Sequence, residues 1–259
     1  MKLAAWQFGV SGDIRQNLAS VRNAAMQAAD KKAGLIVFPE CALTGYPPRD
    51  IPGPSDMDMR AAAEAADALQ ETADRAGIHI LAGMVVQSGP GYCNRACLFS
   101  PGKPVQWYDK RALWGWDREN FIPGTEPGVF DICGFRIGVR ICFEVRFPEY
   151  FRELYRAGTD LNIVLFYDVA DHDDADRYGM IRGHLVTRAV ENVTPVLSVN
   201  AIRPWQTAPT CMISASGTVC CELERNREGL LVYDFEKREL NFGESGRKQY
   251  SDLLLGLKD

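Results

Sequence analysis

Three polar side chains with complementary chemistry stand at the ends of apolar, strand-like runs of the sequence: Glu40, Lys110 and Cys142. In layered α/β folds, ligand sites gather at the carboxyl ends of strands, so these three side chains can meet at one site. Taken singly, each has a structural explanation, because loop glutamates and lysines are usually solvated and a cysteine after a strand usually belongs to the core. The coincidence of the three is therefore the signal.

Together, these residue types supply what hydrolysis of an amide requires. A thiol with an ordinary pKa of about 8.5 must lose its proton to attack, and the Glu40 carboxylate can take that proton and later pass it to the leaving amine. The tetrahedral intermediate carries negative charge on the former carbonyl oxygen. Lys110 and the backbone N–H of Phe143, which follows the nucleophile Cys142, can stabilise that charge. We predict a cysteine-dependent hydrolase of small amides.

Other chemistries have weaker support in the sequence. A papain-like Cys–His pair would need a tuned histidine, but His79 lies in a strand-like run, His172 in an acidic loop and His184 in a helical segment. The sequence has no Gly-x-Ser-x-Gly elbow, no Gly-x-Gly-x-x-Gly and no phosphate loop. The Cys93-x-x-x-Cys97 pair has no histidine nearby. We therefore expect no metal and no cofactor.

Composition is that of an ordinary globular enzyme. A chain of 259 residues is within reach of one layered domain, so we expect a single domain over 1–259. Net charge is −5 with acids and bases mixed, and no apolar run approaches the roughly 20 residues of a membrane helix, so neither nucleic acid nor membrane is an expected partner. No export signal is visible and the eight cysteines are dispersed, which predicts a cytoplasmic protein with reduced cysteines.

Apolar periodicity predicts alternating strands and helices. We expect strands at 3–8, 34–39, 78–86, 93–99, 104–108, 135–141, 161–167 and 194–200, and helices at 17–31, 59–76, 149–158 and 177–192. A hairpin-like pair within 211–235 favours mixed strand pairing in a layered α/β domain. Residues 236–259 hold few core-forming runs, which predicts an extended tail held against a neighbouring surface or a second subunit.

The segments around the three polar residues carry a family resemblance. They read Phe38-Pro39-Glu40 with Thr44-Gly45-Tyr46, Tyr108-Asp109-Lys110-Arg111 with Phe121-Ile122-Pro123-Gly124, and Ile141-Cys142-Phe143-Glu144-Val145-Arg146-Phe147-Pro148-Glu149, followed by Arg188 to Asn192 and by Asn200. Along essentially the whole chain this resembles the nitrilase superfamily of carbon–nitrogen hydrolases. The resemblance implies a four-layer αββα sandwich, cofactor-free hydrolysis through a thioester, and association into a homodimer or higher homo-oligomer. It assigns Glu40 as general base, Lys110 as the lysine that stabilises the intermediate, and Cys142 as nucleophile.

Many members of that superfamily carry a further glutamate between the lysine and the Pro-Gly pair. In this sequence, Glu119 fits the arrangement of aliphatic amidases, whereas the commoner spacing falls on Asp117. We prefer Glu119 because its longer side chain is that of the glutamate found in the family, and a solvated loop position is the alternative for Asp117.

The segment after the nucleophile is similar to the amidase-like branch that includes ω-amidases, which favours an amide over a nitrile. Arg146 can bind a substrate carboxylate through its planar guanidinium, or form a structural ion pair with Glu144 or Glu149. Further residues that we expect to bind the small-molecule substrate are Tyr46, Phe143 and Phe166.

The acidic loop 168–176 follows a strand end and should border the pocket. Where ω-amidase-like sequences often read Val-Ala-Asn-Trp, this one reads Val169-Ala170-Asp171-His172, and an added carboxylate disfavours an anionic keto-acid substrate unless a base offsets it. An amine-bearing substrate or a solvated acidic surface loop would explain this sequence equally well. The functions that compete with hydrolysis of a small amide are those of an N-carbamoyl amine amidohydrolase, a nitrilase, or a non-catalytic binding or assembly member of the fold.

Overall fold

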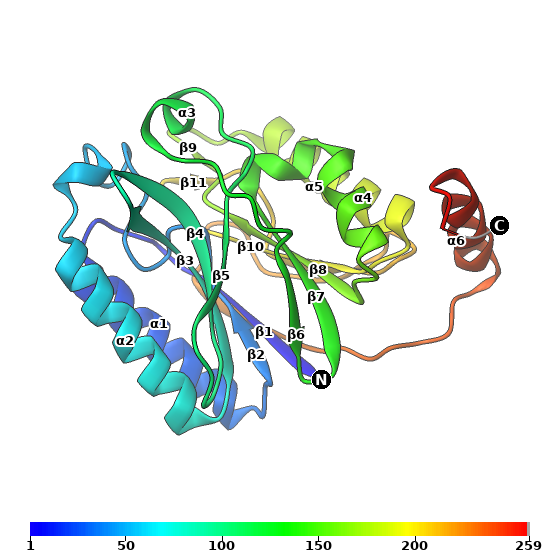
Figure 1. Cartoon of the computed structure of the whole chain (residues 1–259), viewed down its shortest axis with the longest axis horizontal. Helices are drawn as coiled ribbons and strands as arrows, with labels where there is room; N and C mark the ends of the chain where they lie inside the picture. Colours follow the sequence, from blue (N-terminus) through cyan, green and yellow to red (C-terminus); the bar gives the residue numbers. More distant parts are fainter. Residues whose placement is uncertain (258–259) are drawn as a thin grey trace.

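The computed structural model describes residues 1–257, in which two six-stranded mixed sheets pack face to face (Figure 1). The strand order of the first sheet is β14-β1-β2-β3-β4-β5. Its strands are β1 Lys2–Gln7, β2 Leu35–Val37, β3 His79–Ser88, β4 Gly91–Phe99, β5 Gln106–Asp109 and β14 Gly229–Asp234.

The second sheet has the order β13-β12-β10-β8-β7-β6. Its strands are β6 Val129–Ile132, β7 Phe135–Ile141, β8 Leu161–Phe166, β10 Val196–Asn200, β12 Cys211–Ile213 and β13 Val219–Glu222. A separate two-stranded ribbon pairs β9 Val169–Ala170 with β11 Trp205–Gln206.

Helices cover the outer face of each sheet, which gives the four layers of an αββα sandwich (Figure 1). The first sheet is covered by α1 Ile14–Asp30 and α2 Met59–Ala76, and the second by α4 Pro148–Arg156 and α5 Ala175–Asn192. Short helical turns are η1 Pro54–Asp56, α3 Trp116–Asn120 and η2 Cys142–Arg146. Within residues 1–257, none of the helices combines the length and the apolar character that crossing a bilayer would require.

The period-2 alternation of the strands separates the apolar core into layers. On β1, Leu3 and Ala5 point into the cluster between the two sheets, whereas Ala4 and Trp6 point into the cluster under α1 and α2. Successive side chains of a strand face opposite sides of the sheet, so one strand serves two layers. This is why the run at 34–39 is apolar throughout and the run at 161–167 is apolar except for buried Asn162.

Most predicted elements are present with shifted ends, and the helix at 59–76 has the predicted bounds. The hairpin within 211–235 is only partly right. β12 and β13 pair antiparallel in the second sheet, but β14 leaves that sheet and pairs antiparallel with β1 in the first. The apolar pattern of a strand predicts that it is buried but does not specify which sheet it joins.

The C-terminal segment also differs from the prediction of an extended tail. Residues 236–241 are extended, but α6 Phe242–Leu254 is a helix that lies apart from the two sheets (Figure 1). It begins with a capping box, in which the Asn241 side chain accepts from Glu244 N and the Glu244 side chain accepts from Asn241 N. The pattern Asn241-x-x-Glu244 is therefore the sequence signal for this helix.

Strand direction explains why the three polar residues meet. β2 and β3 are parallel, β4 is antiparallel to β3, and β5 is antiparallel to β4, so β2 and β5 end at the same edge of the first sheet. Glu40 and Lys110 follow these two strands, and Cys142 follows β7 of the second sheet. The site thus takes two residues from one sheet and one from the other.

Candidate active site

Glu40 is a buried carboxylate with a fixed orientation. Its side chain is 1% exposed. Oε1 accepts hydrogen bonds from Asn94 Nδ2 at 2.7 Å and from Lys110 Nζ at 2.8 Å, and Oε2 accepts from the Tyr167 backbone N–H at 2.8 Å. Three donors from separate parts of the chain therefore hold the carboxylate in place: one on β4, one just after β5 and one just after β8.

The turn that carries Glu40 lies directly against β3, and Gly83 makes this possible. A Cβ atom at position 83 would lie 2.4 Å from Cys41 N and 2.6 Å from Glu40 Cα. Both are backbone atoms that have no room to move aside. The Gly83 carbonyl also accepts from Leu43 N at 3.0 Å, which closes the turn over the strand. A glycine at this position is thus part of how the sequence places Glu40.

Lys110 lies between two carboxylates. Its buried ammonium is 2.8 Å from Glu40 Oε1 and 2.8 Å from Asp117 Oδ2, and the Tyr46 hydroxyl donates to the other oxygen of Asp117. Burial lowers the pKa of Lys110, but Glu40 and Asp117 outweigh it and hold that pKa well above its ordinary value. The lysine is therefore a fixed positive charge at neutral pH.

Cys142 has an unusual backbone conformation for its residue type. It is the first residue of η2, and its φ is +45°, in the left-handed region that non-glycine residues rarely adopt. A residue held in this region needs support from its surroundings, and such residues cluster at functional sites. The turn directs the chain out of β7 at the point where the thiol is needed.

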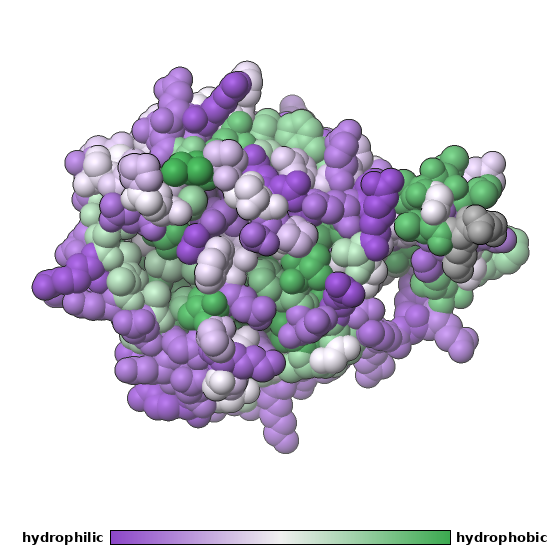
Figure 2. Space-filling model, viewed as in Figure 1, coloured by the Kyte–Doolittle hydropathy of each residue, from purple (hydrophilic) through white to green (hydrophobic). Residues whose placement is uncertain are grey.

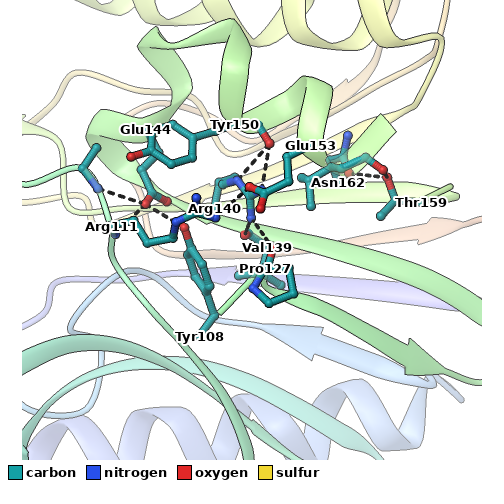
Figure 3. A network of polar contacts seen from close by, with 12 residues as sticks. Tyr108, Arg111, Pro127, Val139, Arg140, Glu144, Tyr150, Glu153, Thr159 and Asn162 are labelled. Atoms are coloured by element: carbon teal, nitrogen blue, oxygen red, sulfur yellow. Dashed lines mark hydrogen bonds and ion pairs between the residues drawn. The ribbon is translucent and has the colours of Figure 1, made fainter. Parts of the chain in front are cut away.

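Glu144 provides that support and links the two strand ends (Figure 3). It is fully buried, and its Oε2 accepts from Ile141 N at 2.7 Å. Its Oε1 accepts from the Tyr108 hydroxyl and from Arg111 N, both at 2.7 Å. One carboxylate therefore holds the segment before Cys142 against the segments on both sides of Lys110.

Arg140 supports the same region from within the second sheet. Its fully buried guanidinium donates to the backbone carbonyls of Tyr150, Pro127 and Val139 and forms an ion pair with Glu153 at 2.9 Å (Figure 3). A buried cation is tolerated because its donors have partners.

The lysine and the cysteine open into one cavity of about 210 Å³. It is lined by Tyr46, Lys110, Trp114, Trp116, Asp117, Cys142, Phe143, Tyr167, Asp168, Val169 and Arg177. The structure thus brings together four residues predicted from the sequence: Tyr46, Lys110, Cys142 and Phe143. Glu40 lies behind Lys110, to which it is hydrogen-bonded.

The charges of the site act on one another. Burial raises the pKa of Glu40, Lys110 opposes this rise, and Asp117 adds to it. Burial and the charge of Glu40 raise the pKa of the Cys142 thiol well above its ordinary value, against the effect of Lys110. The resting site therefore holds a protonated thiol, which needs a base at the moment of attack.

The preference for Glu119 as the fourth carboxylate is wrong in its geometry. Glu119 is exposed, whereas Asp117, two residues earlier on α3, is buried against Lys110. Residues i and i+2 of a helix do not share a face, so only one of the two can reach the lysine. The commoner family spacing gives the position that the structure supports.

Phe166 is also misplaced by the sequence prediction. It is fully buried in the cluster that contains Ile181 and Leu185 of α5, and only its carbonyl approaches the site, where it accepts from Glu40 N at 3.3 Å. The next residue, Tyr167, lines the cavity and stacks on Tyr46 with ring centroids 5.0 Å apart. The sequence prediction therefore placed the cavity-lining aromatic residue one position too early.

Arg146 is not among the cavity-lining residues in the described part of the chain. It is half-buried, with its guanidinium 5.9 Å from the centre of the Phe143 ring. The arginine on the cavity wall is Arg177 of α5, which pairs with buried Asp168 through Nε at 2.7 Å and Nη2 at 3.1 Å. No local pattern distinguishes Arg177 from other helical arginines, so the sequence prediction missed it.

The acidic loop 168–176 is largely neutralised by arginines from elsewhere. Besides the pair just described, the ion pairs are Asp171 with Arg49 at 2.7 Å and Asp173 with Arg225. Asp174 caps the N-terminus of α5 by accepting from Arg177 N. Of these three arginines, Arg177 is the one that lines the cavity, and it is already paired with Asp168. Within residues 1–257, no group of three or more potential ligand side chains is placed to hold a metal ion.

This arrangement of fold and site agrees with the comparison with protein families. The model of the carbon–nitrogen hydrolase family matches residues 2–240. The chain belongs to the carbon–nitrogen hydrolase family.

Individual proteins are similar to this chain over part of its length. The chain is 33% identical over 171 residues to Hydrolase Rv0480c of Mycobacterium tuberculosis, which covers 62% of this chain and 59% of that protein. It is 28% identical over 179 residues to the 2-oxoglutaramate amidase of Bacillus subtilis, covering 68% of this chain and 66% of that enzyme. The match thus spans less than two thirds of the length of these relatives.

Solved structures give the fold over a longer range. An amidase from Nesterenkonia sp. superposes with a TM-score of 0.80 at 26% identity, covering 91% of this chain and 90% of that one. A mutant of the Nesterenkonia sp. AN1 amidase, with a TM-score of 0.81 and 26% identity over 91% of this chain and 93% of that one, shows the Michael addition of acrylamide at its active-site cysteine.

Proposed function

We propose that this protein hydrolyses the carbon–nitrogen bond of small primary amides through a thioester on Cys142. The observation that carries the proposal is the buried Glu40–Lys110 pair, 2.8 Å apart, beside a cavity that Lys110 and Cys142 both line. Membership of the carbon–nitrogen hydrolase family and similarity to amidases support it.

In the first half of the reaction, Glu40 takes the proton of the Cys142 thiol as the sulfur attacks the amide carbon. The carbonyl oxygen becomes an oxyanion, which the Lys110 ammonium and the Phe143 N–H stabilise. The intermediate then collapses, the carbon–nitrogen bond breaks, and Glu40 returns its proton to the leaving nitrogen. Ammonia departs and the acyl group remains on sulfur.

In the second half, Glu40 takes a proton from a water molecule that attacks the thioester. The carbon–sulfur bond breaks, the proton passes to the sulfur, and the carboxylic acid leaves. Asp117 contributes by keeping Lys110 charged and in place, and Tyr46 does so by holding Asp117. The same carboxylate thus serves as base and as acid in each half.

Replacement of the nucleophile tests this proposal. Cys142→Ala should abolish ammonia release from propionamide and the acyl adduct that intact-mass spectrometry detects on the wild-type protein. Cys220→Ala, which removes an exposed thiol on β13, is the matched control and should retain both. A Cys142→Ala protein that releases ammonia at the wild-type rate would overturn the proposal.

A further inference from the structure

A second hollow, of about 480 Å³, adjoins the catalytic cavity. It is lined by Ala112, Leu113, Trp114, Phe143, Phe147 and Tyr150, which we call the aromatic groove. Trp114 and Phe143 line both the groove and the catalytic cavity. The groove therefore begins beside Phe143, the residue that follows the nucleophile, and shares this wall with the catalytic cavity.

The aromatic walls of the groove are held in a defined geometry. Phe147 packs edge-to-face against Phe143, with centroids 5.1 Å apart, and against Tyr150 at 6.2 Å. Arg146 lies over the Phe143 ring and Arg111 over the Tyr150 ring, at 5.9 and 5.0 Å. Such contacts favour one arrangement of the rings, so the groove is formed before a ligand arrives.

The lining of the groove contrasts with that of the adjoining cavity. No charged side chain is among the six groove residues, whereas Lys110, Asp117, Asp168 and Arg177 all line the cavity. Within the groove, Trp114 is 70% exposed and Phe147 is 36% exposed. An uncharged apolar group is the ligand that gains by covering these surfaces, because it removes apolar area from water without stranding a charge.

We propose that the aromatic groove binds an apolar acyl substituent, so that the preferred substrates are primary amides of aryl-bearing or bulky apolar carboxylic acids. The inference rests on the proposed amide hydrolysis. A primary amide releases ammonia, which needs no extended binding site, so the group that fills the groove belongs to the acyl side. The catalytic cavity then holds the reacting amide and the groove selects the acid.

Comparison of two substrates in variant proteins tests this inference. The ratio of kcat/KM for phenylacetamide to that for acetamide should exceed tenfold in the wild type. Phe147→Ala should lower this ratio roughly tenfold, the scale on which apolar pockets discriminate. Met26→Ala is the control, because Met26 is a similarly exposed apolar side chain on α1 and should leave the ratio unchanged.

Binding to an inactive protein supplies an independent measurement. Calorimetry should show that phenylacetamide binds Cys142→Ala about tenfold more tightly than it binds the Cys142→Ala, Phe147→Ala double variant. An unchanged substrate ratio and an unchanged affinity would overturn the inference while amide hydrolysis stands. A Phe147→Ala variant that alters the oligomeric mass and not the ratio would also overturn it, by showing the groove to be a contact between copies. A wild type that neither turns over amides nor forms an adduct would instead refute the proposed function.

Discussion

The catalytic cavity and helix α6 reverse the usual distribution of residues in opposite ways. In the cavity region, Glu40, Lys110 and Asp117 are charged and buried, although charged residues are seldom found inside. On α6, Phe242 is 96% exposed and Leu254 is 74% exposed, and Figure 2 shows apolar residues gathered on this helix. The buried charges satisfy one another within one chain. The exposed apolar side chains gain nothing from facing water, which suggests a role outside the chain.

Removal of the central cation should produce the largest effect. Lys110→Met leaves Glu40 and Asp117 as two buried carboxylates without the ammonium they share. We expect loss of measurable ammonia release and a free energy of unfolding lower by about 3–5 kcal/mol, the cost of stranding a buried charge. Denaturant unfolding at pH 7 measures the stability, with Lys103→Met, at an exposed position, as control.

The sign of the pH effect distinguishes this cause from simple loss of packing. Lys110 lowers the pKa of Glu40, so without Lys110 the Glu40 carboxylate would take up a proton more readily, and the stability deficit should shrink as the pH falls toward 5. A deficit that is the same at both pH values would show that the buried charges do not account for it.

The two candidates for the fourth carboxylate provide a matched pair. Asp117→Asn removes a charge 2.8 Å from Lys110, and we expect kcat to fall about 100-fold, the scale of losing one preorganised electrostatic partner. Glu119→Gln removes an exposed charge on the same helix and should change kcat by less than about twofold. Equal losses in the two variants would contradict the role assigned to Asp117.

Asp117→Asn should also move the acid limb of the kcat/KM profile. Glu40 must be ionised to act as a base, and burial raises its pKa above the ordinary 4.5. As the pH is lowered, kcat/KM should therefore begin to decrease at a pH above 4.5. Asp117 adds to the rise. Its neutralisation should therefore shift the acid limb to lower pH, which a pH series on the residual activity measures.

The positions of the three candidate catalytic residues could be predicted because each signal is local. Each of the three follows an apolar run: Glu40, Lys110 and Cys142. The end of a strand can be predicted from the residues on either side of it. Position 117 against 119 could not be settled, since a helix of five residues is too short for its phase to emerge from the sequence. Arg177 lines the cavity because of the position in which α5 packs on the second sheet. The residues next to Arg177 in the sequence do not specify that position.

In the fold, too, features set by neighbouring residues could be predicted, whereas contacts between distant parts of the chain could not. The bounds of α2 were predicted because alanine-rich helical periodicity ends at Gly77, whose φ is +64°. The pairing of β14 with β1, more than 220 residues apart, depends on how the two sheets close, and strand alternation alone does not specify it.

Glu144 tests whether the cavity depends on its support. In wild type, the two carboxylate oxygens of Glu144 accept from the backbone N–H groups of Ile141 and Arg111. In Glu144→Gln, one of these oxygens becomes an NH2 group, which is a donor, so one of the two N–H groups loses its acceptor. We expect kcat to fall about tenfold with KM little changed, and stability to fall by about 1–3 kcal/mol. Glu149→Gln, at an exposed position on α4, is the control. A lower stability with an unchanged kcat would indicate a purely structural role.

The smallest effect on catalysis is expected on α6, where we propose that the exposed apolar face contacts a second copy of the chain. The inner face of the helix is already held to the body, because the Tyr155 hydroxyl donates to Asp252 at 2.6 Å, so Leu254 stays turned outward. Leu254→Lys should lower the oligomeric mass measured by light scattering, and Gln249→Lys, which adds the same charge at another exposed position, should not. Because every residue assigned to the reaction lies in one chain, kcat should change by less than about twofold. If kcat were lost together with the oligomeric mass, the catalytic cavity would depend on a second copy of the chain. The cavity would then not be complete within one chain, contrary to the comparison with α6 made above.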